Sequence, residues 1–131
     1  MFLLDTDIAS AIIKNRTALG NYVHLLTESE WAISAVTQME LRFGMLTMPP
    51  EHKSRKLIAS FLMHAPAVAF DNRAADETAK IRAKLKLDGA QIGFYDPLIA
   101  GHALAIGAVL VTANTKHFAN IEGLETTNWL K

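Results

Sequence analysis

Short apolar segments alternate with longer segments of helical periodicity along this chain, and this alternation limits the fold more than any other feature. Residues 108–111 (Ala-Val-Leu-Val) are apolar at every position, which is typical of a strand buried on both faces of a parallel sheet. Phe2–Leu4 is a similar run near the start of the chain. Parallel strands need crossover connections, which are right-handed. The sequence therefore predicts an α/β fold built on a short parallel sheet.

Helix caps and helix-ending residues set the expected boundaries of the elements. Ser34 and Asn72 each precede a helical segment, and both residue types favour the N-cap. Pro97 fits the first position of a helix, and Gly107 fits its C-terminal end. The expected strands are residues 2–4, 31–33, 67–70, 108–111 and 124–127, and the expected helices are residues 8–14, 22–27, 35–48, 52–63, 73–87 and 96–106.

Length and composition narrow the class of protein. With 131 residues, half of them apolar, the chain is expected to form one domain over residues 1–131. It contains no cysteine, which excludes disulfides, thiolate zinc sites and thiol nucleophiles. We expect no signal peptide, because carboxylates interrupt the apolar N-terminus, and no span of the roughly 20 apolar residues that cross a bilayer. These features are compatible with a reducing cytoplasm, where we expect the protein to act.

The net charge is zero, but the charges are unevenly distributed. Residues 42–86 contain nine Lys or Arg against four Asp or Glu, so the rest of the chain carries a net charge of −5. A basic segment beside an acidic centre fits a protein that cuts a polyanion with a bound cation. Solvated helix surface would produce the same asymmetry.

Three polar residues occur where a parallel sheet collects its ligands, at the carboxyl ends of the strands. Asp5 directly follows the first strand, and Asn114 follows the strand at residues 108–111. Asp96 begins the helix that leads into that strand. Because helix starts and strand ends can share one rim, these three side chains are expected to converge.

Glu40 is a fourth candidate. It shares a helical face with Val36 and Phe43, at spacings of four and three residues. A carboxylate on a face that packs against the core is costly unless it is paired or bound to metal, and the sequence offers no evident Arg or Lys partner.

Each candidate also has a purely structural interpretation. Asp5, Thr6 or Asp7 can cap the first helix, and Asp96 before Pro97 is a favourable N-cap. Asn114 can shape a turn. If all of them are caps, the chain is a non-enzymatic α/β binding module. A phosphatase or a DNA nuclease would use a similar acidic site. A phosphatase would also need a phospho-acceptor Asp in a different motif, and a DNA nuclease a larger DNA-binding surface. Neither feature is visible in the sequence.

A group of carboxylates needs a cation. At about 5 Å and an effective dielectric near 20, each pair repels by on the order of 3 kcal/mol. Oxygen ligands select hard cations, so Mg²⁺ is expected at such a cluster, with Mn²⁺ as a substitute. A cation held in this way activates water and neutralises charge on a phosphoryl group, which indicates phosphodiester hydrolysis.

The order and spacing of several motifs identify a family. The sequence resembles the PIN-domain ribonucleases, and within them the VapC-type toxins, over nearly its full length. The segments that carry the resemblance are 3–8 (LLDTDI), 33–37 (ISAVT) with Glu40-Leu41, 91–96 (QIGFYD), 99–103 (IAGHA), 110–114 (LVTAN), His117-Phe118, Gly123-Leu124 and Trp129.

The resemblance implies a three-layer α/β/α sandwich and a Mg²⁺-dependent endoribonuclease that leaves 5′-phosphate and 3′-hydroxyl ends. The family's first three acidic positions correspond to Asp5, Glu40 and Asp96, which would bind the metal. Asn114 stands at the fourth, where the wider family often has Asp. Asp7 stands where many relatives have Asn. The hydroxyls of Thr6 and Thr112 correspond to hydroxyl groups that act as positioning groups in the family.

The resemblance also implies partners. It indicates the toxin of a type II toxin–antitoxin pair, a homodimer that a VapB-like antitoxin neutralises. The expected substrate is the anticodon loop of a tRNA, and initiator tRNA is the favoured one. Cleavage of this loop would inhibit translation. Phe94 or Tyr95 could stack on loop bases, but either could also be a core residue. The antitoxin is expected to place a basic side chain among the acids and to pack on Phe43, Leu46 and Met48. These three residues could equally belong to the toxin's own core or to its dimer contact.

Overall fold

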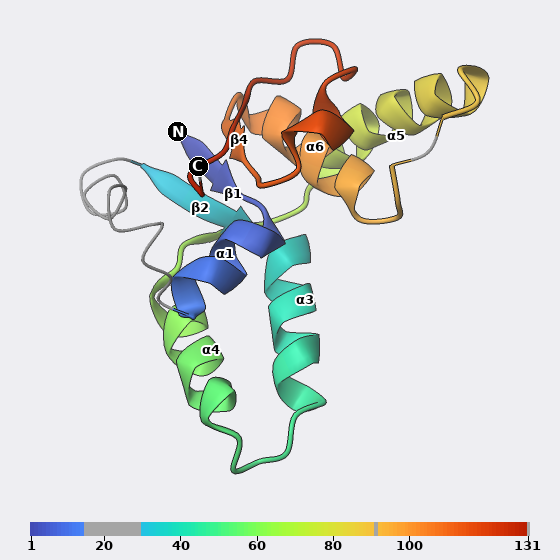
Figure 1. The fold of residues 1–131 in the computed structure, drawn as a ribbon. Coiled ribbons are helices and arrows are strands. Elements are labelled where there is room, and N and C mark those ends of the chain that lie inside the picture. Colours follow the sequence, from blue (N-terminus) through green and yellow to red (C-terminus); the bar gives the residue numbers. More distant parts are fainter. Residues whose placement is uncertain (15–29, 91, 131) are drawn as a thin grey trace.

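Five parallel strands form one sheet in the order β3-β2-β1-β4-β5 in a computed structural model that describes residues 1–14, 30–90 and 92–130 (Figure 1). The first strand is central, with Leu3 opposite Ala32 on one side and Leu110 on the other. The strands are β1 (Phe2–Leu4), β2 (Trp31–Ser34), β3 (Ala67–Val68), β4 (Val109–Val111) and β5 (Thr126–Thr127). All four pairings are parallel, as the sequence predicts.

Helices connect these strands. The described α-helices are α1 (Thr6–Ile13), α3 (Ala35–Leu46), α4 (Lys53–His64), α5 (Asn72–Leu87) and α6 (Asp96–Ile106), and a 3₁₀ helix, η2, covers Thr115–Phe118. The helix expected at residues 22–27 lies outside the described residues. Among the residues that the structure does describe, no helix combines the length and the apolar character needed to cross a membrane.

The strands send alternate side chains to the two faces of the sheet. Leu3 and Leu110 pack with residues of α5 and α6 on one face, whereas Leu4 and Val111 pack with α1 on the other. All four side chains are fully buried. The expected three-layer α/β/α sandwich is therefore confirmed, and burial on both faces explains why these strands are apolar at every position.

The helices α3 and α4 form a hairpin that extends beyond the sheet (Figure 1). Leu41 and Ile58 join the two helices to Ala9 of α1 in a small core of their own. Phe43 lies on the outer side of α3 and is 68% exposed. The expectation that the face shared by Glu40 and Phe43 packs against the core is therefore wrong at Phe43, because the hairpin carries this turn of α3 beyond the sheet.

Most expected caps are present, with one displaced. Ser34 caps α3 by accepting a hydrogen bond from the Val36 N–H at 3.0 Å. The N-cap of α5 is Asp71 and not Asn72, because the Asp71 carboxylate accepts the Ala74 N–H at 3.0 Å and Asn72 is already helical. Gly107 ends α6 in the left-handed region at φ +66°. Both edge strands, β3 and β5, are shorter than expected, since each pairs on one side only.

The two helices that cover one face of the sheet, α5 and α6, approach each other closely at Gly101. A Cβ atom on Gly101 would lie 2.7 Å from the backbone nitrogen of Thr78 and 2.8 Å from its Cα. The Thr78 hydroxyl turns back to donate a hydrogen bond to the Ala74 carbonyl at 2.7 Å. Any side chain at position 101 would push the two helices apart.

This contact gives a test of the packing. Gly101→Ala should lower the free energy of unfolding by about 1–3 kcal/mol, because overpacking outweighs the gain in helix propensity. Gly44→Ala in α3 is the matched control, since a Cβ there meets nothing within 4 Å. It should raise stability by up to about 1 kcal/mol. Urea denaturation measures both, and equal effects of the two substitutions would contradict the close approach.

Candidate active site

The candidate site lies at the carboxyl edge of the sheet, where the strand order reverses. The chain adds β2 and β3 on one side of β1, and then β4 and β5 on the other. Asp5 directly follows β1 and Thr112 directly follows β4. The Asp5 N–H donates to the Val111 carbonyl at 2.9 Å, which fixes the two strand ends against each other. Ligands of open α/β sheets bind at such reversals.

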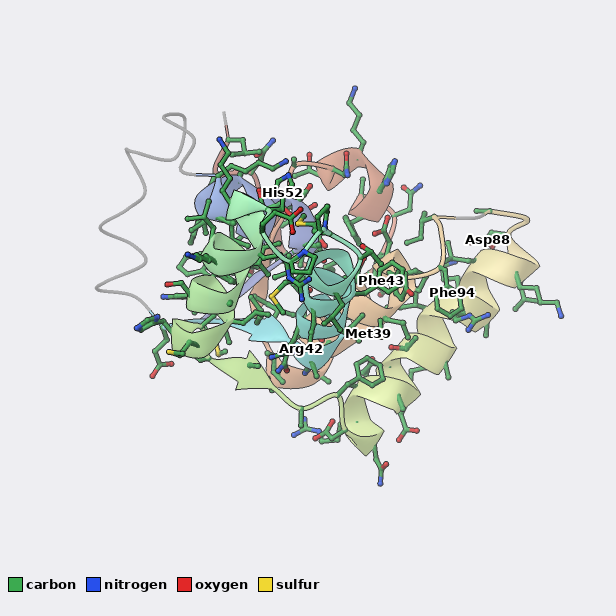
Figure 2. The ribbon with its side chains drawn as sticks, turned by 90° about the horizontal axis from the view of Figure 1, so that it is seen from below. Met39, Arg42, Phe43, His52, Asp88 and Phe94 are labelled. Carbon is green, nitrogen blue, oxygen red and sulfur yellow. The ribbon has the colours of Figure 1, made fainter. Side chains whose placement is uncertain are left out.

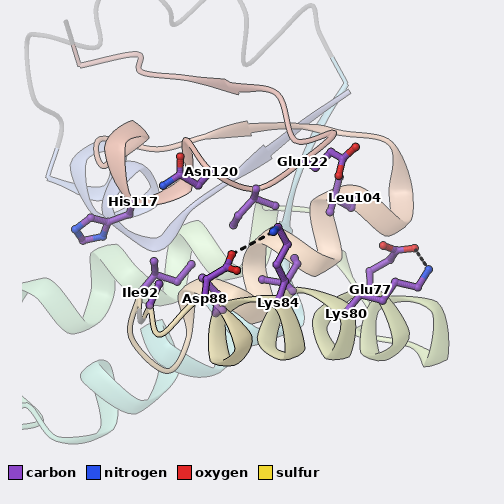
Figure 3. A pocket seen from close by; sticks show the side chains of 13 residues that line it. Glu77, Lys80, Lys84, Asp88, Ile92, Leu104, His117, Asn120 and Glu122 are labelled. Carbon is purple, nitrogen blue, oxygen red and sulfur yellow. Dashed lines mark hydrogen bonds and ion pairs between the residues drawn. The ribbon is translucent and has the colours of Figure 1, made fainter.

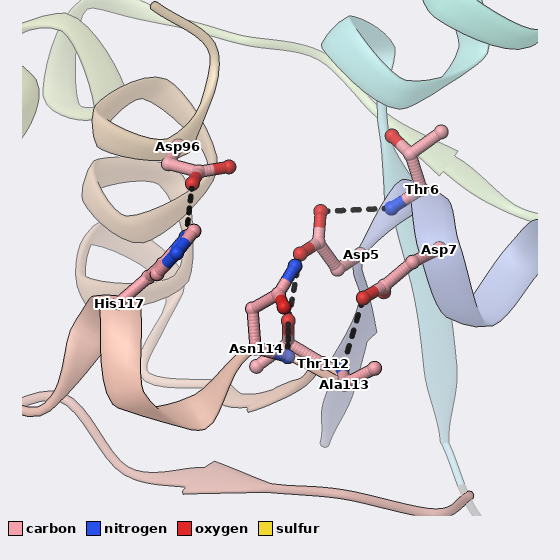
Figure 4. A network of polar contacts seen from close by, with 8 residues as sticks. All are labelled: Asp5, Thr6, Asp7, Asp96, Thr112, Ala113, Asn114 and His117. Atoms are coloured by element: carbon pink, nitrogen blue, oxygen red, sulfur yellow. Dashed lines mark hydrogen bonds and ion pairs between the residues drawn. The ribbon is translucent and has the colours of Figure 1, made fainter. Parts of the chain in front are cut away.

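Asp5 is held by hydrogen bonds to both of its carboxylate oxygens (Figure 4). Oδ1 accepts the Thr6 N–H at 2.8 Å, and Oδ2 accepts the Thr112 hydroxyl at 2.8 Å. The side chain is 7% exposed. Asp5 is also the N-cap of α1, so the structural interpretation is correct for this residue, and its role in a functional site stays a prediction.

Asp7 lies beside Asp5 in the first turn of α1. Its Oδ2 accepts the Ala113 N–H at 3.0 Å, which connects α1 to the loop after β4 (Figure 4). Its Oδ1 is buried and has no hydrogen-bond partner in the described part of the chain. A buried carboxylate oxygen without a donor is costly, and a bound cation or its water would satisfy it.

Glu40 reaches the same rim from α3. The Thr6 hydroxyl donates to Glu40 Oε1 at 2.8 Å and lies 3.3 Å from Thr37 Oγ1. Glu40 is half-buried. The sequence did not reveal a partner for Glu40, and in the structure this partner is the Thr6 hydroxyl. The hydroxyl gives Glu40 a hydrogen bond but does not neutralise its charge.

Asp96 contacts a residue that sequence reasoning did not assign to the site. Its Oδ2 lies 3.3 Å from Nδ1 of His117 in η2 (Figure 4). The expected N-cap role of Asp96 is wrong: Tyr95 occupies the cap position, no side chain caps α6, and Asp96 is its first helical residue. In the sequence, His117 is marked only by its place three residues after Asn114 and by the His117-Phe118 pair that belongs to the family resemblance, and neither assigns it to the site.

Asn114 makes its contact to the site through the backbone. Its N–H donates to Thr112 Oγ1 at 3.1 Å, and it occupies the N-cap position of η2 without a capping bond from its side chain. The side chain is exposed. Its turn-forming role is therefore present, and its amide is available to a ligand at the rim.

A further histidine, His102, packs behind the rim. It is fully buried, and its Nδ1 shares a hydrogen bond with Ser34 Oγ at 2.7 Å. Burial is the main cause that lowers the pKa of His102. This contact ties α6 to the end of β2, behind the acidic rim.

The four carboxylates influence one another. Burial first, and then repulsion by Asp7, raises the pKa of Asp5 from 3.8 to about 6, although the Thr112 and Thr6 hydrogen bonds oppose the change. Burial is also the main cause of the raised pKa of Asp7 and of Glu40. Asp96 raises the pKa of all three. The structure therefore brings Asp5, Asp7, Glu40 and Asp96 into one negative field.

The donor set at this rim suits a hard cation. All four acidic side chains offer oxygen, and among the described residues His117 is the one side chain whose nitrogen contacts them. Within residues 1–14, 30–90 and 92–130, no three His, Asp or Glu side chains form a ready coordination group. Mg²⁺ does not require one, because it keeps several waters and is usually bound through one or two carboxylates.

Comparison with known proteins gives one consistent result. A model of the PIN domain matches residues 2–124. The chain is 36% identical over 128 residues to the tRNA(fMet)-specific endonuclease VapC of Shigella flexneri, and the matched region covers 98% of this chain and 97% of the relative. It is 32% identical over 133 residues to Ribonuclease VapC2 of Rickettsia felis, and the matched region covers 100% of this chain and 99% of the relative.

Solved structures agree with this. VapBC2 from Rickettsia felis, bound to a DNA fragment from its promoter, contains a chain that matches with a TM-score of 0.88 at 31% identity, over 98% of both chains. The DNA-bound VapBC from Salmonella typhimurium matches with a TM-score of 0.87 at 34% identity, over 98% of this chain and 97% of that chain.

The pKa of Asp5 gives a prediction about stability. Because the pKa is higher in the folded protein than in the unfolded chain, the folded state binds protons more tightly, and the free energy of unfolding falls as pH rises from about 4 to above 6. In metal-free buffer at pH 7.5, Asp5→Asn should therefore raise the free energy of unfolding by on the order of 1–3 kcal/mol, since Asn still accepts the Thr6 N–H.

Thermal melts between pH 4.5 and 8 measure this effect, and the gain should shrink toward pH 4.5. Asp76→Asn, which removes an exposed carboxylate from α5, is the control and should change little at any pH. An Asp5→Asn protein that melts lower than the wild type at pH 7.5 would show that the carboxylate is not under repulsion.

Proposed function

Because the chain belongs to the PIN-domain family and, within it, to the VapC ribonucleases, we propose that it is the toxin of a type II toxin–antitoxin pair that cuts RNA with Mg²⁺. Mn²⁺ is expected to substitute. The observation that carries the proposal is the convergence of four carboxylates at the strand-order reversal, with a buried Asp7 oxygen that has no donor in the described chain. One catalytic domain over residues 1–131 is part of the proposal.

The residues have distinct proposed roles. Asp5 and Asp96 hold the cation, directly or through water, and Glu40 completes the acidic group. When bound, Mg²⁺ supplies an activated water and neutralises charge on the phosphoryl group. Asn114 orients a water or a phosphate oxygen through its exposed amide, and Asp7 adds a further acceptor at the rim.

The two site hydroxyls act by positioning. Thr112 fixes Asp5 Oδ2, and the Thr6 hydroxyl fixes Glu40 Oε1, so that neither carboxylate is free to rotate away from the rim. Burial behind the rim keeps bulk water from Asp5, which strengthens its interaction with a cation. The His117 contact holds Asp96 in the same manner from the opposite side.

We propose the anticodon loop of initiator tRNA as the substrate, whose cleavage in the cytoplasm inhibits translation. Relatives at 36% and 34% identity carry the name tRNA(fMet)-specific endonuclease. Phe94 and Tyr95, directly before Asp96, are both exposed, and their rings meet edge to face at 5.0 Å. They are not core residues, and exposed aromatic rings beside a nuclease site suit the unstacked bases of a loop.

We also propose a homodimer and a VapB-like antitoxin as partners, because the similar chains of known structure come from VapBC complexes. Phe43 and Leu46 are exposed on α3, with Met48 half-buried beyond its end, and this surface suits an apolar helix of the antitoxin. Figure 2 shows Met39 and Phe43 on the side of α3 that faces away from α4. A basic side chain of the antitoxin would form charge-assisted hydrogen bonds with the acids.

The non-enzymatic alternative remains testable. Asp5 does cap α1, as a binding module would require. That alternative does not account for Asp96, which caps nothing, or for the raised pKa of Glu40 and Asp7. Caps alone would leave the protein indifferent to divalent cations, whereas the nuclease proposal requires a response.

Asp96→Asn tests the catalytic role. The variant should fold, because Asp96 supplies no cap, and should lose RNA cleavage by at least about a hundredfold, since the amide is a poorer ligand without charge. Cleavage of an anticodon stem–loop RNA and growth inhibition after induction measure the loss. Asp76→Asn removes the same charge far from the rim and should keep full activity. Full cleavage by a folded Asp96→Asn protein would remove Asp96 from the mechanism.

Metal dependence is tested by stability as well as activity. Mn²⁺ or Mg²⁺ should raise the melting temperature of the wild type by mass action, with a gain of about 2.7 kcal/mol at 100 times the Kd. The gain should be much smaller in Asp5→Asn. Activity should disappear in EDTA and return with Mg²⁺, and a nuclease that survives thorough chelation would refute the proposed cation.

A further inference from the structure

The helix α5 carries two pairs of basic residues at a spacing of four, and the two pairs have different surroundings. Lys80 donates to Glu77 at 3.3 Å and Lys84 donates to Asp88 at 3.1 Å (Figure 3). These lysines line a cavity of about 590 Å³ that also contains Glu122, so three acids surround two basic groups there. The positive charge of this first pair is locally compensated.

The second pair, Arg82 and Lys86, is not compensated. Both side chains are exposed, and neither has an ion pair or a side-chain hydrogen bond within the described chain. They line a neighbouring groove of about 870 Å³, which shares Leu85, Ala90 and Ile92 with the first cavity. Its described lining residues include no acid: Arg82, Ala83, Leu85, Lys86, Gly89, Ala90, Ile92, Gly93 and Pro97.

The groove reaches the helix that carries Asp96. Its lining residue Pro97 directly follows Asp96 in the first turn of α6. The groove then follows residues 92–93 to the C-terminal half of α5. Its walls are low, because Gly89 and Gly93 carry no side chain and a Cβ at either would meet nothing within 4 Å. An extended polyanion leaving the rim therefore meets an open path with two free positive charges.

We propose that this groove binds the backbone phosphates of the RNA strand on one side of the cleaved bond, through Arg82 and Lys86. The inference rests on the proposed ribonuclease function and adds how the substrate is held. Residues four apart on a helix have Cβ atoms roughly 5–6 Å apart, a spacing at which two side chains reach successive phosphates. An RNA cut at the rim must continue away from it, and the neighbouring compensated cavity offers no net attraction.

Phosphate contacts outside the reacting bond strengthen binding without changing the chemical step. The double variant Arg82→Gln with Lys86→Gln should therefore raise KM for cleavage of an anticodon stem–loop RNA on the order of tenfold and leave kcat unchanged. Binding of the fluorescein-labelled RNA is measured in proteins that also carry Asp96→Asn, which prevents cleavage. The slope of log Kd against log salt concentration should be smaller by about 1.4 in the double variant than in the protein with Asp96→Asn alone, or roughly 0.7 for each lost phosphate contact.

The matched control removes the same two charges from the same helix. The double variant Lys80→Gln with Lys84→Gln lowers the net charge equally but changes only compensated residues, and it should keep the salt slope and KM of the wild type. All four positions are exposed, and thermal melts verify that both variants fold. Equal weakening by the two variants would show an effect of net charge alone and would overturn the proposal.

Two further outcomes separate this inference from the proposed function. A wild type that cleaves RNA, with unchanged KM and salt slope in the Arg82 and Lys86 variant, would overturn the groove and leave the ribonuclease standing. Weaker capture of the antitoxin by that variant, with RNA binding intact, would assign the groove to an acidic partner segment and also overturn it. A wild type that neither binds nor cleaves RNA would refute the proposed function itself.

Discussion

The hydrogen bonds that hold the Asp5 carboxylate connect the fold to the site. Its two oxygens accept from Thr6 at the start of α1 and from Thr112 at the end of β4, while its own N–H bonds to the carbonyl of Val111. One side chain therefore caps a helix, joins the two central strands and faces the acidic rim. The same holds for Asp7, whose bond to the Ala113 N–H also joins α1 to the loop after β4, so the groups that orient these two carboxylates also connect distant parts of the fold.

That arrangement has a cost, which the surrounding core offsets. Desolvation and mutual repulsion both disfavour the ionised carboxylates at neutral pH, as the raised pKa of Asp5 shows. The side chains of Leu3, Leu4, Leu110 and Val111 are fully buried on the two faces of the sheet and supply the compensating stability. Positions that sequence rules treat as destabilising are the positions where functional sites are usually found.

Local patterns predicted the scaffold well and the contacts between distant segments poorly. The α/β class, the parallel sheet, the Ser34 cap and the end of α6 at Gly107 follow from residues close in sequence, and all are confirmed. The cap role of Asp96 was wrong because its carboxylate turns to His117, 21 residues away, and that contact has no periodic signature. The exposure of Phe43 depends on the α3–α4 hairpin leaving the sheet, which the helical pattern of α3 alone does not reveal. The roles of the site residues in catalysis remain predictions.

The order in which the sheet is made has a consequence for the newly synthesised chain. The central strand β1 is the first element, but its neighbour β4 begins at Val109, and the Asp5–Thr112 hydrogen bond spans 107 residues. Trp129, near the C-terminus, packs edge to face against Phe2 of β1 at 5.3 Å. Contacts of such long range form late in folding. A chain still emerging from the ribosome therefore has Asp5, Asp7 and Glu40 before it has the strand that orients Asp5, so the acidic rim can assemble only after β4 and Thr112 have been made.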